Sequence, residues 1–235
     1  MAQYRMYWPP VTRNFKIIAG VLFGLWIASV LIEPLGAFMR ANMLVSRDAV
    51  VERHQIWTLL SYSLWHADFF HLLFNLFVLY IFGSEIDRAW KPSTWWRYLA
   101  ICALGGGIVV VLSQLIFSTN YPTLGFSGAV MGVVAAYAWY HWDQKLNFLF
   151  IPMTGKMLLL VFIGIDIFFV VFGREAISIA GHLGGMATGL LLVTGYWRPA
   201  KLKQILRHRR NRNRLKLLRR PPETKPKRNG VDKPN

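Results

Sequence analysis

Residues 98–117 read YLAICALGGGIVVVLSQLIF, a run of apolar and small residues without one charged side chain. A helix of about 20 apolar residues rises about 30 Å, the thickness of the hydrocarbon core of a bilayer. Further apolar stretches with few charged residues cover residues 17–38, 69–87, 125–142, 157–173 and 178–197. Six such runs would leave a soluble protein too little polar surface to cover them. We therefore predict an all-α polytopic membrane protein with six transmembrane helices.

The positive charge of the chain is concentrated at one end. The chain has 235 residues, of which 54% are hydrophobic, and a formal net charge of +16. Residues 198–235 hold 15 of the 27 Lys and Arg residues, so a basic tail follows an apolar chain. We predict a cytoplasmic N-terminal segment over residues 1–16, a membrane domain over 17–197 and a basic cytoplasmic tail over 198–235.

The connections between the predicted helices indicate the orientation. Those on the side of the termini are the more basic, and they carry Arg88, Lys91, Arg97, Lys145 and Lys156. By the positive-inside rule we expect both termini in the cytoplasm and, as the location, a bacterial inner membrane. The tail is expected to contact anionic lipid, which explains its charge without nucleic acid. The long connection 39–68 is expected to lie against the bilayer rather than to act as a simple linker.

Four polar side chains within the predicted helices lie at similar depths. At about 1.5 Å per residue from the inner end of each helix, Ser127 and His182 both lie about 24 Å up. On a neighbouring helix His71 and Asn75 lie about 25 Å and 20 Å up. Polar groups at membrane depth are costly, so each one is a candidate for function. Together they predict a site near the outer edge of the hydrocarbon.

A serine and a histidine at one depth suit nucleophilic catalysis without a cofactor or a metal. His182 would take the proton of the Ser127 hydroxyl and later deliver it to the leaving amine. His71 and Asn75, which share one helix face, and the Ser127 backbone N–H would donate hydrogen bonds to the oxyanion. Each residue alone also suits helix packing or an interhelical hydrogen bond. Their coincidence in one layer favours catalysis.

Three motifs carry a family resemblance: HLLFN at 71–75, GFSG at 125–128 and GHLGG at 181–185. With Gly189, their order resembles that of the rhomboid family of intramembrane serine proteases over roughly residues 15–197. The resemblance implies a six-helix fold and a Ser–His dyad without an acid, in which Ser127 is the nucleophile and His182 the base.

The same resemblance implies further roles. His71 and Asn75 would be the oxyanion donors, and the substrates would be single-span or polytopic membrane proteins, cut near the outer end of a transmembrane helix. Gly185 would let the last helix pack closely on the helix of Ser127, and so would Gly189. His66 matches a common pattern in the first loop. Met131 departs from the family, because some members place a tyrosine there against the catalytic histidine.

Other classes of membrane protein fit the sequence less well. No histidine begins the HExxH motif of a zinc protease, and no GxGD motif of an aspartyl protease is present. A catalytically silent rhomboid-like protein that binds client transmembrane helices stays open as the alternative. A polytopic transporter and a processing protease devoted to one sorting signal are further alternatives.

Asp166 is an acidic residue in the middle of the predicted helix 157–173. Counted from Lys156 it lies about 15 Å up, which is about 9 Å lower than Ser127 and His182. An orienting acid must lie within about 3.2 Å of the base. We therefore expect Asp166 to be a structural residue and not a third member of the site.

Overall fold

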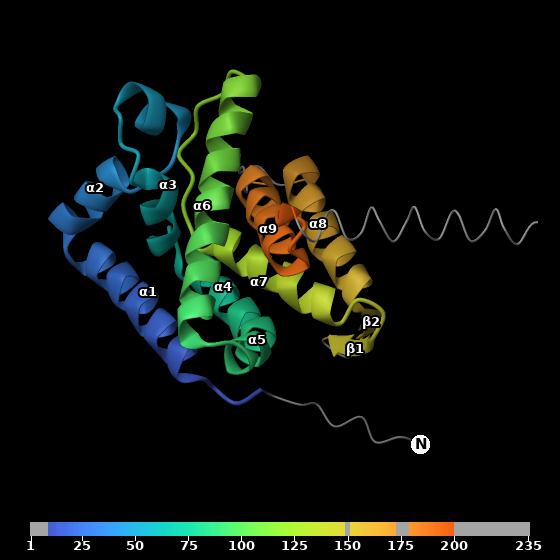
Figure 1. Ribbon diagram of the computed structural model, residues 1–235. Coiled ribbons are helices and arrows are strands. Elements are labelled where there is room, and N and C mark those ends of the chain that lie inside the picture. Colours follow the sequence, from blue (N-terminus) through green and yellow to red (C-terminus); the bar gives the residue numbers. More distant parts are fainter. Residues whose placement is uncertain (1–8, 149–150, 173–178, 200–235) are drawn as a thin grey trace, which may run out of the picture. The chain divides into compact units, whose positions relative to one another are not determined.

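The computed structural model describes residues 9–148, 151–172 and 179–199 (Figure 1). Helices dominate these residues, and one antiparallel hairpin of two strands interrupts them. The elements are α1 (Arg13–Leu31), α2 (Glu33–Asn42), η1 (Asp48–Glu52), α3 (Thr58–Ser61), η2 (Tyr62–Leu64), α4 (Phe69–Val78), η3 (Leu79–Gly83), α5 (Ser84–Ala89), α6 (Pro92–Ile116), α7 (Ser127–Tyr140), β1 (Lys145–Phe148), β2 (Ile151–Thr154), α8 (Gly155–Phe172) and α9 (Ile179–Thr194).

The helices form the all-α polytopic membrane fold that the sequence predicts. Within the described residues, three helical stretches are long and apolar enough to cross a membrane, namely Arg13–Leu31, Phe69–Ala89 and Pro92–Ile116. The helix α9 is apolar but has 16 residues, and α7 has 14. A helix as short as α7 rises only about 21 Å, less than the full hydrocarbon thickness.

The first predicted span, residues 17–38, is wrong at both ends. The helix α1 begins earlier, at Arg13, because the Thr12 hydroxyl accepts a hydrogen bond from the Phe15 N–H at 3.1 Å and caps the helix. It ends at Leu31, and α2 begins two residues later with Pro34 in its first turn. In a continuous helix Pro34 would lack the N–H that bonds to the Val30 carbonyl, and its ring would clash with that carbonyl, so it breaks the apolar run into two helices.

The connection 39–68 packs against other elements, so it is no simple linker. The Tyr62 hydroxyl donates to the Ala103 carbonyl of α6 at 2.8 Å. The Tyr62 carbonyl accepts from the Gly125 N–H at 2.9 Å, just before α7 begins. Val45 and Thr123 exchange two backbone hydrogen bonds, of 3.1 and 2.8 Å. These contacts hold the segment that leads into α7.

Close glycine contacts join α9 to α7. A Cβ atom on Gly185 would collide with the carbonyl oxygen of Gly128, and one on Gly189 would lie 2.8 Å from the Cα of Gly132. The predicted close packing at Gly185 and Gly189 is thus confirmed. Small residues allow such an approach of helix backbones in a membrane. The two helices in contact are those that carry Ser127 and His182 (Figure 1).

Candidate active site

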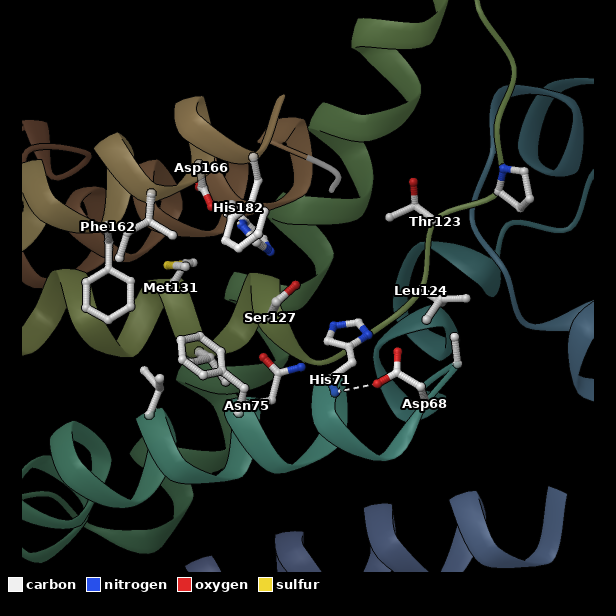
Figure 2. A pocket seen from close by; sticks show the side chains of 17 residues that line it. Asp68, His71, Asn75, Thr123, Leu124, Ser127, Met131, Phe162, Asp166 and His182 are labelled. Atoms are coloured by element: carbon white, nitrogen blue, oxygen red, sulfur yellow. Dashed lines mark hydrogen bonds and ion pairs between the residues drawn. The ribbon is translucent and has the colours of Figure 1, made fainter. Parts of the chain in front are cut away.

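A cavity of about 510 Å³ lies among α4, α7, α8, α9 and the segment before α7. All four site residues predicted from the sequence line it, and Figure 2 shows their side chains around one space. The remaining lining is largely apolar and includes Phe74 and Val78 of α4 and Phe162 and Phe169 of α8. Polar groups from several elements thus face a largely apolar chamber.

Ser127 is the first residue of α7, and the turn before it decides its position. Gly125 has a φ of 109°, which a residue with a side chain rarely adopts. The chain then turns sharply into the helix, and Ser127 lies at the helix N-terminus, where backbone N–H groups have no partner within the helix. In the part of the chain that the structure describes, the Ser127 N–H donates no hydrogen bond. It is therefore free to bind a negative charge in the cavity.

His182 of α9 contacts a carboxylate. Its Nδ1 lies 2.7 Å from Oδ1 of Asp166, on the neighbouring helix α8. The Asp166 side chain is 3% exposed and the His182 side chain 13%. This pair is buried beside Ser127 in the wall of the cavity (Figure 2).

The predicted height difference of about 9 Å between Asp166 and His182 is therefore wrong. The prediction counted helical rise from Arg198, but α9 ends at Thr194, and a turn with Gly195 at a φ of 65° follows. Along the observed helices His182 lies about 18 Å from the end of α9, and Asp166 lies about 17 Å from the start of α8. The two side chains consequently meet at one level.

Asn75 is held by His66, which comes from the connection before α4. Nε2 of His66 lies 3.2 Å from the Phe126 backbone N–H and 3.1 Å from Nδ2 of Asn75. A backbone N–H only donates, so this Nε2 carries no proton and also accepts from the Asn75 amide. Burial lowers the pKa of His66 to about 3, so the ring stays neutral at ordinary pH. One hydrogen of the Asn75 amide is thereby bound, and the second remains for the cavity.

His71 lies at the start of α4, beside the turn that precedes Ser127. The Asp68 side chain caps this helix by accepting a hydrogen bond from the His71 N–H at 2.8 Å. The imidazole ring lies over Gly125, where an added Cβ would come within 2.6 Å of its Cε1 atom. It also meets the His66 ring edge to face, at 5.0 Å between centroids. Glycine is therefore required at position 125 for two reasons: it adopts the φ of the turn, and it leaves space for the His71 ring.

The sequence did not assign two of these contacts. It singled out Asp166 as a buried acid but placed it at the wrong height. His66 stood out only through its position five residues before His71, without a role. Across the described residues, Ser127 Oγ makes no hydrogen bond to His182, and no three His, Cys, Asp or Glu side chains group closely enough to hold a metal ion. In enzymes without substrate such catalytic hydrogen bonds are often long.

Comparison with known proteins identifies the family. Residues 53–199, more than half of the chain, match the Rhomboid domain. The chain belongs to the rhomboid family.

This rhomboid is similar to proteins from distant organisms. It is 28% identical over 169 residues to RHOMBOID-like protein 12, mitochondrial, of Arabidopsis thaliana. The aligned region covers 66% of this chain and 50% of that protein. It is 25% identical over 180 residues to rhomboid protease GluP of Bacillus subtilis, with 72% of this chain and 32% of that protein covered. Inactive rhomboid-related protein 2 of Caenorhabditis elegans is 22% identical over 212 residues, with 86% and 58% covered.

These relatives limit what the family says about this rhomboid. The chain spans between 32% and 58% of their lengths. Their names include a protease and an inactive protein. Family membership therefore gives the fold and the membrane setting, whereas an activity depends on the residues around the cavity.

Proposed function

We propose that this rhomboid is an intramembrane serine endopeptidase that cleaves transmembrane helices of membrane proteins near their outer end. The observation that carries the proposal is the cavity in which Ser127, His182, His71 and Asn75 meet. Ser127 is the nucleophile, and His182 takes its proton and passes it to the leaving amine. No cofactor or metal takes part.

The oxyanion of the tetrahedral intermediate forms beside the N-terminus of α7. The free Ser127 N–H, the second amide hydrogen of Asn75 and the His71 ring are its donors. The positive end of the helix dipole adds to their attraction for negative charge. Fixed donors of this kind supply a large share of the rate in acyl transfer.

Membrane proteins are the proposed substrates because of the apolar wall of the cavity. Phe74 and Phe169, which line it, are 53% and 44% exposed on α4 and α8. A substrate helix brings apolar side chains, and it reaches this wall from the lipid without crossing water. Single-span and polytopic proteins both meet this requirement.

The proposed orientation places both termini in the cytoplasm and the cavity toward the opposite face. The bacterial inner membrane expected from the sequence is not supported by the comparisons, because several of the similar proteins are named mitochondrial. The predicted basic tail, residues 198–235, lies almost wholly outside the described residues, and its contact with anionic lipid stays a prediction. Half of the N-terminal segment 1–16, residues 1–8, likewise lies outside the described residues, and its cytoplasmic location stays a prediction.

The alternative is a catalytically silent rhomboid that binds client helices. The similarity to a relative named inactive is the observation that keeps it in view. Against it stands the presence in one cavity of a serine, a histidine and oxyanion donors, which helix binding alone does not need.

The test is reconstitution of the purified full chain into liposomes with a panel of single-span reporter helices. Wild type is expected to cut at least one reporter, and Ser127→Ala and His182→Ala are expected to cut none while melting like the wild type. A fluorophosphonate probe should label Ser127 only when His182 is present. Asn75→Ala should lower turnover by about 10² to 10³ with little change in KM. Equal cleavage by wild type and Ser127→Ala would overturn the proposal, whereas reporter binding without cleavage would favour the silent protein.

A further inference from the structure

We infer that Asp166 is a positioning residue that holds His182 in the tautomer with its proton on Nδ1 and a free Nε2. The inference rests on the proposed function, because it concerns the base of that reaction. The chain would then use a Ser–His–Asp arrangement and not a dyad.

The geometry of the pair carries this inference. Oδ1 of Asp166 lies 2.7 Å from Nδ1 of His182, a short distance for a hydrogen bond to a carboxylate. The residues belong to different helices, α8 and α9, so the contact depends on the tertiary structure. Both side chains line the cavity that holds Ser127 (Figure 2).

The hydrogen bond selects one form of the imidazole. A neutral histidine carries one proton, and an ionised carboxylate only accepts. With the proton on Nδ1 donated to Asp166, Nε2 keeps its lone pair for the Ser127 hydroxyl. When Nε2 takes that proton, the imidazolium lies against the carboxylate, which favours the charged state. The Nδ1 proton stays where it is throughout, and the serine proton leaves with the amine.

The surroundings of Asp166 give a second reason. Its other oxygen, Oδ2, is buried and has no hydrogen-bond partner in the described part of the chain. Buried carboxylates at membrane depth are costly, and they are usually paired or functional. The partner of Asp166 among the described residues is His182, the histidine that becomes charged during the proposed reaction.

Positioning also explains how His182 is held without an aromatic neighbour at position 131. Met131 occupies the position where some family members place a tyrosine against the histidine, and it lines the same cavity. A thioether can contact an imidazole face but makes no directional hydrogen bond that would fix the tautomer. Asp166 supplies the directional contact that methionine lacks.

The variant that tests this inference is Asp166→Asn, with Asp87→Asn as its matched control. Asp87 is also a buried aspartate with one oxygen bound, by Asn14 at 2.6 Å, and one without a partner, but it lies on α5 and does not line the cavity. We expect Asp166→Asn to lower kcat by about 10² to 10⁴ with KM nearly unchanged, as for loss of a triad acid. The kcat of Asp87→Asn should stay within about threefold of that of wild type, because a substitution remote from His182 does not change which ring nitrogen carries the proton.

A spectroscopic measurement separates positioning from structural support. Nitrogen-15 NMR of the histidine-labelled chain, with the His182 signals assigned by their absence in His182→Ala, should show the Nδ1–H tautomer in wild type and a mixture in Asp166→Asn. An Nε2–H tautomer in wild type would overturn the inference, even if Asp166→Asn failed to fold. Activity of Asp166→Asn within about threefold of wild type, with Ser127→Ala inactive, would overturn it too. An active Ser127→Ala would instead count against the proposed function, and the NMR measurement would still decide the tautomer.

Discussion

The imidazole of His66 connects three parts of the site. It accepts hydrogen bonds from the backbone before Ser127 and from the Asn75 amide, and its ring lies against that of His71. A single buried acceptor thus fixes the turn into α7 and Asn75, the proposed oxyanion donor on α4. Loss of such an acceptor leaves two buried donors without a partner, at about 1–3 kcal/mol each.

His66→Gln tests this burial through its pH dependence. The pKa of His66 is about 3 in the folded protein, below its ordinary value of 6.5, so the unfolded chain binds the proton more readily. The stabilisation by the neutral ring is complete above about pH 6.5 and is lost as the pH falls toward 3, at up to about 1.4 kcal/mol per pH unit. Between about pH 7.5 and pH 5 the stability advantage of wild type over His66→Gln should shrink by about 2 kcal/mol. Thermal or denaturant unfolding in micelles measures it, and parallel pH curves would contradict the prediction.

At the scale of elements, glycines set the distance between α7 and α9. Gly185 lies against the Gly128 carbonyl, whereas Gly164 of α8 has open space where a Cβ would be. The two positions are therefore a matched pair of helical glycines, one in close packing and one free. Comparing alanine substitutions at the two positions separates the effect of close backbone packing from the general cost of a glycine in a helix.

We predict that Gly185→Ala lowers the free energy of unfolding by about 1–3 kcal/mol, because the methyl group must push α7 and α9 apart. Turnover should fall with it, since these helices carry Ser127 and His182. Gly164→Ala should be neutral or should stabilise the protein by up to about 1 kcal/mol. Unfolding in micelles and reporter cleavage measure both variants, and equal losses of stability would argue against close packing as the cause.

At the scale of the whole molecule, the cavity lies at one end of α7, the helix that carries the proposed nucleophile. Ser127 begins α7, and Tyr140, where α7 ends, is about 20 Å away along the helix axis. In the proposed orientation the Tyr140 end faces the cytoplasm. The reacting hydroxyl then lies toward the outer half of the bilayer.

Cut sites in single-span reporters should therefore fall in the outer third of the reporter helix. Mass spectrometry of the products from liposomes locates the cut, and reporters inserted in either direction serve as each other's control. The reason is geometric, because a substrate bond must reach Ser127 at its own depth. Products cut at the cytoplasmic end would contradict the orientation and leave the residues of the site unaffected.

The sequence by itself determined the class of fold and the candidate residues. Apolar runs near 20 residues predicted membrane helices, because crossing a bilayer requires that length. The motifs around His71, Ser127 and His182 selected the side chains that line the cavity. These features are local, so a linear reading can find them. The glycine positions at 185 and 189 were likewise readable, since close packing requires the absence of a side chain.

Only the tertiary structure decided which side chains meet. Helical rise counted from the sequence placed His182 about 9 Å above Asp166, mainly because the end of α9 at Thr194 is set by a turn that hydropathy does not show. The short α7 likewise reflects backbone geometry inside an apolar run, whereas the break between α1 and α2 follows from Pro34 itself. The contacts of Asp166 with His182 and of His66 with Asn75 join separate segments. Such contacts depend on where helices start, end and pack, and these positions are fixed by the fold as a whole.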